Sequence, residues 1–231
     1  MLYFILMLFI IVLYAFGLTF MKKMKNTRFF NLLFTSLVVI FYLYCLIHIY
    51  RDVGAQDWNF TNALPTANVS PFTYCLTPFI FIFPKKIRPY FLALLALLSF
   101  GLMCAGLLTC IGNIARNYAF HLTIALDTLS HAILSFLGVY LYQSKQIELT
   151  KQISLIGGSI IVGVAALMLV LNLIFHTSFF GLSLYGNHNI YNFVLVDNGY
   201  LSALIYFVGL CCVLIIGYFY QKFINYVLNK K

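Results

Sequence analysis

The sequence predicts a single all-α membrane domain with seven transmembrane helices, occupying residues 1–231. Two observations lead to this prediction: the composition of the chain and the placement of its basic residues. Of 231 residues, 63% are hydrophobic and 8% are charged, whereas a soluble domain has about a quarter of its residues charged. Lipid must therefore surround most side chains, and the length leaves no room for a separate soluble domain.

Seven apolar segments follow one another along the chain. They lie at about 2–20, 29–50, 71–84, 90–111, 119–142, 153–175 and 200–221. Most of them reach the ~20 residues that a helix needs to cross a hydrocarbon core of ~30 Å. The first has no basic residue ahead of it and no small-residue cleavage site, so we expect a retained helix and not a signal peptide.

The third segment is unusually short. Pro71 and Pro84 bracket its fourteen positions and Pro78 divides them. At about 1.5 Å per residue the segment covers only about 21 Å. It either takes in residues upstream or forms a broken helix that lines a cavity, because irregular backbone at membrane depth must face protein or water.

The basic residues predict the orientation of the chain. Twelve of them fall in alternate loops and the C-terminal tail, against Arg51 and Arg116 on the other side: Lys22, Lys23, Lys25, Arg28, Lys85, Lys86, Arg88, Lys145, Lys151, Lys222, Lys230 and Lys231. The positive-inside rule then places the N-terminus outside and the C-terminus in the cytoplasm. We expect a multi-pass protein of a plasma membrane, of the bacterial cytoplasmic type.

The same clusters indicate the partners of the chain. They are short and flank apolar segments, so the net charge of +9 predicts contact with membrane lipids and not with nucleic acid. A homo-oligomer or another membrane protein subunit is equally compatible with the sequence. Phosphate-binding loops, dinucleotide-binding glycines and metal-ligand spacings are absent from the sequence, so we expect no cofactor and no metal.

The fifth segment carries a stripe of polar and small residues on one helix face, at spacings of three and four. Its members are Thr123, Asp127, Ser130, His131, Ser135, Gly138 and Tyr142. Ionisable groups inside a membrane are costly and almost always face the bundle interior. Measured from residue 119, His131 lies about 18 Å deep, near the midplane.

Two interpretations of this stripe stay open. In the first, Asp127 supports His131, which acts as a general base in a polar pocket open to the outer leaflet. In the second, the stripe only fastens the helix to its neighbours. The first interpretation predicts that His131 faces Ser70 or Asn68 across the pocket.

A second polar set begins the third segment, where Asn68, Ser70 and Thr73 precede the apolar run. Ser70 is either the N-cap of a helix that starts at Pro71 or a nucleophile activated by a histidine. Cys75 is the intrinsically stronger nucleophile, but apolar residues flank it. We therefore predict Ser70 as the nucleophile, with Asn68 and Thr73 in contact with substrate.

A third set lies in the outer loop "YGNHNIYNF", at 185–193. His188, Asn189 and Asn192 either bind a polar headgroup, as part of a lid, or serve only as turn residues. His121, near the outer end of the fifth segment, is a further candidate for substrate binding. The histidines show no i, i+4 pair of the kind that binds zinc.

The architecture and three motifs carry a family resemblance. The motifs are "LPTANVS" at 64–70, "SHAILSFLGVYLY" at 130–142 and "GNHNIYNFVL" at 186–195. With seven spans and an external N-terminus, the chain resembles the YwaF-type bacterial integral membrane proteins, which are similar to animal transmembrane phospholipid acyltransferases. The resemblance implies acyl transfer on lipids, with His131 in the site.

One departure from the family affects the predicted chemistry. After "LP" the family carries a histidine and then a nucleophilic cysteine, whereas this chain has Ala67 or Asn68 followed by Val69 or Ser70. Either Ser70 replaces the thiol in a lipid acyltransferase or hydrolase-like enzyme, or the chain keeps only a binding pocket. The alternatives to an enzyme are a ligand-binding or transport subunit and a structural partner in a membrane complex.

Overall fold

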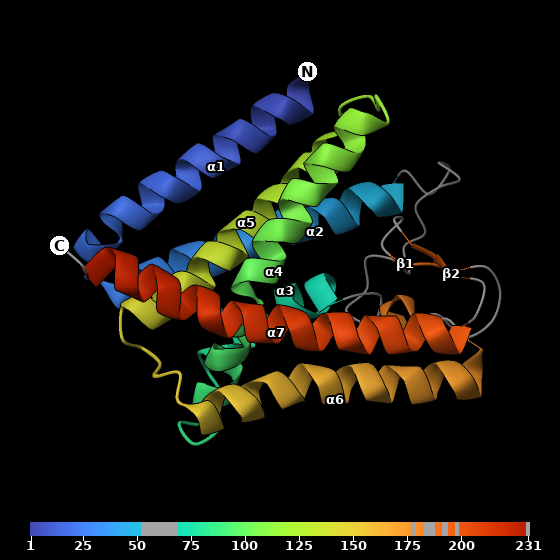
Figure 1. Ribbon diagram of the computed structural model, residues 1–231. Helices are drawn as coiled ribbons and strands as arrows, with labels where there is room; N and C mark the ends of the chain where they lie inside the picture. Colours follow the sequence, from blue (N-terminus) through green and yellow to red (C-terminus); the bar gives the residue numbers. More distant parts are fainter. Residues whose placement is uncertain (52–68, 177–178, 183–187, 191–193, 197–198, 230–231) are drawn as a thin grey trace.

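The computed structural model describes residues 1–51, 69–176, 179–182, 188–190, 194–196 and 199–229. The described part is a bundle of α-helices with a small β-hairpin (Figure 1). The elements in chain order are α1 (Leu2–Phe20), η1 (Met21–Lys23), α2 (Thr27–Arg51), α3 (Val69–Ile80), α4 (Arg88–Ala115), α5 (Leu122–Gln143), α6 (Lys151–Phe175), η3 (Phe179–Gly181), β1 (His188–Ile190), β2 (Val194–Val196) and α7 (Gly199–Asn229).

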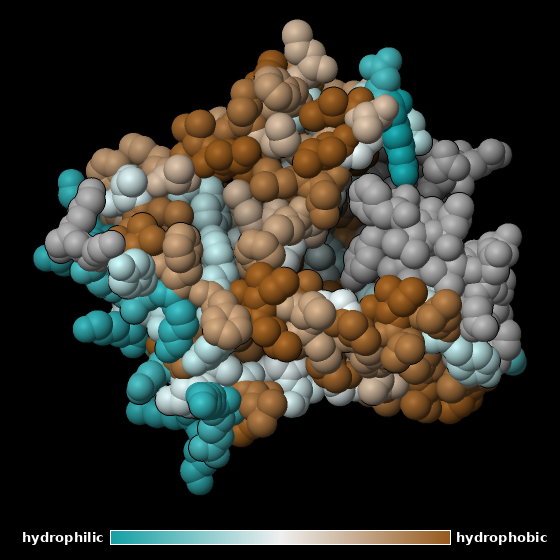
Figure 2. Space-filling view, in the orientation of Figure 1, coloured by the Kyte–Doolittle hydropathy of each residue, from teal (hydrophilic) through white to brown (hydrophobic). Residues whose placement is uncertain are grey.

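The fold is compatible with a multi-pass membrane protein. Within the described ranges, six helices are long and apolar enough to cross a membrane, namely all the α-helices except α3. Their outward surfaces are strongly apolar, and in the space-filling view hydrophobic residues cover much of the bundle (Figure 2). The seven apolar segments of the sequence thus appear as seven α-helices, of which six have the length of a span.

The third helix differs from the predicted span. It runs over 12 residues, two positions earlier at its start and four earlier at its end than the 71–84 segment. At about 1.5 Å per residue it covers about 18 Å, little more than half of a hydrocarbon core. Pro78 lies inside it and removes one backbone donor, and Pro84 precedes the turn into α4. The structure therefore has a short third helix.

α4 is the centre of the bundle and packs against α5, α6 and α7. Two glycines allow the helix backbones to approach closely. A Cβ atom on Gly138 of α5 would lie 2.5 Å from the Leu95 carbonyl oxygen, and one on Gly217 of α7 would lie 1.8 Å from the Leu97 carbonyl oxygen. Small residues at such crossings are typical of membrane helices, because close packing replaces the hydrophobic driving force.

The two ends of the bundle differ in charge. At one end the Tyr140 hydroxyl donates to the Met24 carbonyl oxygen at 2.8 Å, and Asn31 pairs with Gln146. These contacts bring the α1–α2 and α5–α6 connections together, and both connections carry lysines. Hydrophilic residues gather in Figure 2 on the side where Figure 1 marks the C-terminus.

Three helices extend past the predicted segments. α7 continues to Asn229, because Gln221 and Ile224 remain buried against the bundle although the apolar run ends near 221. α4 runs from Arg88 to Ala115, and α2 begins at Thr27. Hydropathy marks the part of a helix that lies in lipid, whereas the helix itself continues beyond that part.

A buried asparagine fastens the segment after α6. His176 ends this helix in the left-handed region, with φ of 52°. The Asn172 side chain accepts from the Phe179 N–H at 2.7 Å and donates to the carbonyl oxygens of Phe179 and Leu182 at 2.9 and 2.7 Å. The pairing of β1 with β2, antiparallel with His188 opposite Val196, follows before α7.

Candidate functional site

The first turn of α3 meets the middle of α5. Ser70, the second residue of α3, places its hydroxyl oxygen 2.8 Å from Nε2 of His131. His131 is the tenth residue of α5 and lies about 14 Å along the axis of a helix of 22 residues. The expected proximity of Ser70 and His131 is therefore present, as a direct hydrogen bond near the middle of the membrane-spanning helix.

The other ring nitrogen of His131 has two close oxygen neighbours. Nδ1 lies 2.6 Å from the Tyr74 hydroxyl and 2.9 Å from the backbone carbonyl oxygen of Asp127. A carbonyl oxygen only accepts, so the contact with Asp127 requires the proton on Nδ1. Nε2 then presents its lone pair to Ser70, whose hydroxyl donates to it. This tautomer, assigned from the hydrogen-bond pattern, is the one that a general base needs.

The Asp127 carboxylate acts mainly through Tyr74. The Tyr74 hydroxyl donates to Asp127 Oδ1 at 3.3 Å, while Oδ2 lies 3.6 Å from Nδ1 of His131. The carboxylate is thus beyond hydrogen-bonding distance of the imidazole but still close to any charge on it. The direct support that we expected from the Asp127 side chain comes instead from its backbone carbonyl and from an intervening tyrosine.

The residues of this site differ in how far they are buried. His131 is 6% exposed and Tyr74 is 1% exposed, whereas the Asp127 side chain keeps a third of its surface accessible and Ser70 is partly buried. Gly106 of α4 supports His131 from behind, since a Cβ there would lie 3.3 Å from the Cβ of His131. His131 is therefore enclosed by its neighbours, whereas Ser70 keeps part of its surface accessible.

Tyr74 is the residue that the sequence analysis missed. It lies one turn after Ser70 on α3, so the i, i+4 spacing places both on the face that meets α5. Its ring packs edge to face on His131, with centroids 5.5 Å apart. Among seventeen tyrosines, only this spacing relative to Ser70 could have indicated it.

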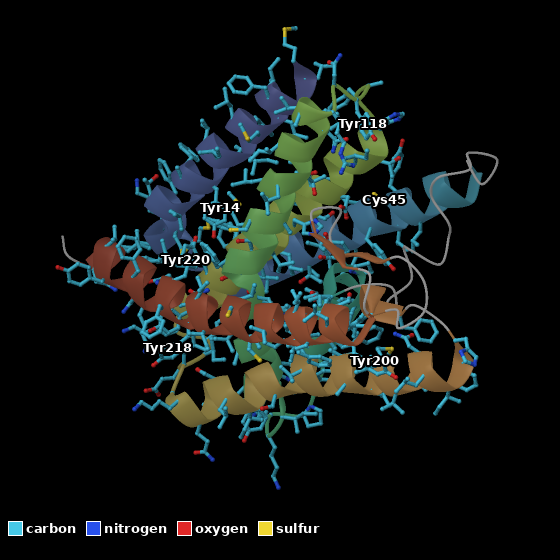
Figure 3. All side chains as sticks on the ribbon, turned by 45° about the vertical axis from the view of Figure 1, so that its right-hand side comes forward. Tyr14, Cys45, Tyr118, Tyr200, Tyr218 and Tyr220 are labelled. Atoms are coloured by element: carbon cyan, nitrogen blue, oxygen red, sulfur yellow. The ribbon has the colours of Figure 1, made fainter. Side chains whose placement is uncertain are left out.

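The rest of the α5 stripe has a structural role. The Ser130 hydroxyl donates to the Leu126 carbonyl oxygen at 2.9 Å within α5 itself. Ser135 lies 3.2 Å from the Tyr14 hydroxyl, which in turn lies 2.8 Å from the Tyr220 hydroxyl and so connects α5, α1 and α7 (Figure 3). The second interpretation, in which the stripe fastens the helix to its neighbours, therefore fits Ser135, whereas the general-base interpretation of Asp127 and His131 stays a prediction.

The predicted substrate-binding residues do not gather at one place. The Thr73 hydroxyl is buried and donates to the Val69 carbonyl oxygen at 2.5 Å, so it is engaged within α3. His121 is exposed as the N-cap of α5, nearly three turns from His131, and its N–H donates to the Tyr3 hydroxyl at 3.1 Å. Asn68 and Asn192 lie outside the described residues, as do the side chains of His188 and Asn189.

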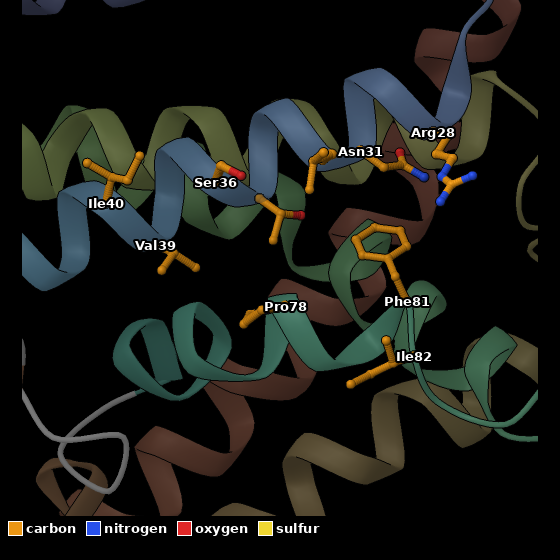
Figure 4. Close-up of a pocket in the computed structure, with 10 residues that line it drawn as sticks. Arg28, Asn31, Ser36, Val39, Ile40, Pro78, Phe81 and Ile82 are labelled. Atoms are coloured by element: carbon orange, nitrogen blue, oxygen red, sulfur yellow. The ribbon is translucent and has the colours of Figure 1, made fainter.

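A cavity of about 670 Å³ lies between α2 and α3 (Figure 4). Its lining includes Pro78 and Phe81 but neither Ser70 nor His131. It is therefore distinct from the pocket that the sequence predicts beside His131. In the described part of the chain, His, Cys, Asp and Glu side chains form no group of three that could hold a metal ion.

In comparisons with known proteins, no protein-family model, no curated protein and no solved structure matches the chain. The resemblance to YwaF-type proteins stays a prediction from three short motifs.

Proposed function

We propose that this multi-pass membrane protein transfers or hydrolyses the acyl group of a lipid, with Ser70 as nucleophile and His131 as general base. The observation that carries the proposal is the 2.8 Å contact between Ser70 Oγ and His131 Nε2. The contacts of Nδ1 with the Tyr74 hydroxyl and the Asp127 carbonyl oxygen hold the ring in this orientation. A nucleophile within hydrogen-bonding distance of a base, itself oriented by a third group, is the signature of covalent catalysis.

The reaction divides into two acyl transfers. Ser70 Oγ attacks the ester carbonyl carbon while its proton passes to Nε2, and the tetrahedral intermediate collapses when that proton moves to the leaving alkoxide. An acyl-serine remains, and a water or a lipid hydroxyl attacks it with the same proton transfers. The Ser70 N–H, in the first turn of α3, has no acceptor within the helix and is our candidate donor to the oxyanion.

Tyr74 and Asp127 stabilise the imidazolium that forms at each step. The carboxylate, 3.6 Å from Nδ1, lowers the energy of a positive ring, and the Asp127 backbone carbonyl holds the ring in position. Low surrounding polarity strengthens this attraction relative to water. Tyr74 is a positioning residue, because it touches the base and the carboxylate and not the reacting atoms.

The position of the site supports a lipid substrate. Ser70 lies level with the middle of α5, about 14 Å from the start of that helix, so the ester group of a lipid reaches it by moving into the bundle while its acyl chain stays in the hydrocarbon. We also propose the N-out, C-in orientation, seven apolar segments with α3 reaching only part of the depth, and a plasma membrane of the bacterial type. The grouping of the basic connections at one end of the bundle supports the orientation.

The first experiment is serine labelling. Purified protein in detergent is treated with a fluorophosphonate probe, and we expect labelling at Ser70 that is lost in Ser70→Ala and in His131→Ala. Ser130→Ala is the matched control, because among the described residues its hydroxyl bonds to the carbonyl oxygen of Leu126 on the same helix. Labelling that persists in Ser70→Ala, or acyl turnover unchanged in both variants, contradicts the proposal.

A second candidate function is proton-coupled transport. The four side chains Ser70, His131, Tyr74 and Asp127 form a continuous polar chain at membrane depth, and such chains relay protons in transporters. Transport into proteoliposomes that depends on Asp127, with no labelling of Ser70, would favour this function over the enzyme.

A further inference from the structure

We propose that the groove between α2 and α3 binds one anionic phospholipid of the cytoplasmic leaflet, apart from the Ser70–His131 site. The groove is the cavity of about 670 Å³ shown in Figure 4. One wall comes from a single face of α2, at spacings of three and four, and the other from the end of α3. The lining residues are Arg28, Asn31, Leu32, Thr35, Ser36, Val39, Ile40, Pro78, Phe81 and Ile82.

The groove exists because α3 is short. After Ile80 the chain turns toward α4 instead of continuing beside α2, so the first half of α2 lacks a full-length neighbour on this face. Leu32, Ile40 and Ile82 on its rim are 67%, 58% and 74% exposed. The groove therefore opens sideways, into the space that lipid fills.

Its dimensions fit one leaflet. From Arg28 to Ile40 the wall of α2 runs for twelve residues, about 18 Å, against about 15 Å for half of a hydrocarbon core. The cavity volume lies within the range of small-molecule sites, about 300–1,000 Å³. A lipid held along this wall has its headgroup at one end and the end of its acyl chain near the middle of the membrane.

The polar end of the groove is cationic and unpaired. Arg28 and Asn31 lie at one end in Figure 4, and Val39 and Ile40 lie at the other. Arg28 is exposed, and in the described part of the chain no carboxylate lies within ion-pair distance of it. A guanidinium binds phosphate through paired charge-assisted hydrogen bonds, and this end belongs to the basic end of the bundle.

A buried hydroxyl in the groove also lacks a partner. Thr35 is 7% exposed and lines the cavity, and its Oγ1 has no hydrogen-bond partner among the described residues. The oxygen itself is enclosed, and an unsatisfied hydroxyl of this kind is costly unless the side chain turns toward an occupant that supplies the missing bond. Thr35 lies one turn beyond Asn31, at the depth of the glycerol and ester oxygens of a phospholipid whose phosphate is on Arg28.

Charge argues against a second copy of the chain in the groove. The chain has a net charge of +9 and five acids, so a second copy would bring more cations to the basic end and leave Arg28 unpaired.

The lipid bound in this groove is also distinct from the lipid substrate proposed for Ser70. A phospholipid anchored at Arg28 keeps its ester groups near the C-terminal end of α3, whereas Ser70 lies at the opposite end of that helix.

The test measures lipid retention by the full chain. Purified protein in non-ionic detergent is mixed with equal amounts of phosphatidylglycerol and phosphatidylcholine of identical acyl chains, freed of unbound lipid, and analysed by native mass spectrometry. We expect phosphatidylglycerol to be retained about tenfold more, a preference that Arg28→Gln abolishes. Arg116→Gln removes the same charge at the opposite end and should leave the preference unchanged.

Two further variants test the groove itself. Thr35→Val should lower phosphatidylglycerol retention about threefold without unfolding the protein, because it removes only the partnerless hydroxyl. Val39→Trp should fill the groove and abolish retention of both lipids. Excess inorganic phosphate should not displace the lipid, since the acyl chain contributes to binding.

Three results would overturn the inference. Equal retention of the two lipids by the unmodified chain excludes headgroup recognition. An equal loss in Arg28→Gln and Arg116→Gln indicates general surface charge. A change from dimer to monomer in Val39→Trp, with lipid retention unaltered, shows that a second copy occupies the groove. None of these readouts depends on the labelling of Ser70, so this inference and the proposed function can fail separately.

Discussion

The two sides of α5 are built in different ways. Toward α4 it presents Gly138 at backbone contact distance, with Leu134, Leu137 and Leu141 completely buried around it. Toward α3 it presents His131 and Asp127, which bond to side chains of a helix that is only 12 residues long. The two full-length helices α4 and α5 pack closely against each other. The short helix α3 instead contacts α5 through polar side chains and leaves a groove beside α2.

This difference shows where function can be placed in a small membrane bundle. Close backbone packing leaves no space for a ligand, and each polar group in it serves a neighbouring helix. Because α3 is short, its first turn, with Ser70, lies at the depth where a full-length span would have its middle residues. We expect substitutions on the α4 side to affect stability, and substitutions on the α3 side to affect activity.

The largest expected effect is on the α3 side. His131→Ala should lower acyl turnover about 10³-fold, in the range of a lost general base, while the protein still purifies as a folded species. The measurement is the release of fatty acid from a short-chain ester in detergent. Activity within a few fold of that of the unmodified protein would show that His131 is not the general base. It would also contradict the expectation that substitutions on the α3 side affect activity.

The next effect is on the packed side. Gly217→Ala should destabilise the fold by about 3 kcal/mol or more, because its Cβ would lie 1.8 Å from the backbone oxygen of Leu97. Gly209→Ala in the same helix is the matched control, since its Cβ would have no neighbour within 4 Å. The control should be neutral or slightly stabilising. Unfolding in mixed micelles by added SDS measures both, and equal stability of the two variants would show that the helices can move apart freely.

Tyr74→Phe should have an intermediate effect on activity. It removes the hydroxyl between His131 and Asp127 but keeps the ring, so we expect a loss of about 10- to 100-fold, the value of a hydrogen bond to a charged group. Tyr140→Phe loses a comparable bond, to the Met24 carbonyl oxygen, at the far end of α5. If both variants lose activity equally, Tyr74 acts through stability and not by positioning the base.

The smallest effect concerns one side chain that makes two interhelical hydrogen bonds on the packed side. Gln221 donates to the Ala96 carbonyl oxygen and to Ser99 Oγ, both at 2.8 Å. Gln221→Leu should cost about 0.6 kcal/mol, the average for hydrogen bonds between membrane helices. Gln152→Leu, at an exposed position of α6, serves as the control in the same SDS titration. A loss of several kcal/mol would mean that polar bonds, and not glycine contacts, hold α7 to α4.

The sequence was most informative where the membrane imposes a strict rule. Apolar length predicted seven spans, because lipid requires about 20 apolar residues per crossing, and six of the helices in the described residues have that length. The stripe at Asp127 and His131 was recognisable because charge inside a membrane is rare and costly. The pairing of His131 with Ser70 or Asn68 followed from the requirement that a nucleophile lie near its base, and the structure has Ser70 Oγ 2.8 Å from Nε2 of His131.

The sequence was least informative where tertiary contacts decide. Helix ends in α4 and α7 exceed the apolar runs, since burial against neighbours and not hydropathy sets them. Thr73 carries a hydroxyl that the sequence assigns to substrate, yet it bonds within its own helix. Tyr74 carries no signal in isolation, because a tyrosine in an apolar run is compatible with simple core packing.

By itself, the sequence determined a set of long apolar helices, as expected of a multi-pass membrane protein, with an ionisable pair inside one of them, because lipid tolerates few alternatives to apolar helices. The tertiary structure alone decided that α3 is short, that Tyr74 joins His131 to Asp127, and that α2 has an open face with Arg28 at one end. These features depend on which helix lies next to which, and helix pairing results from the packing of small residues and single hydrogen bonds, which no local pattern in the chain specifies.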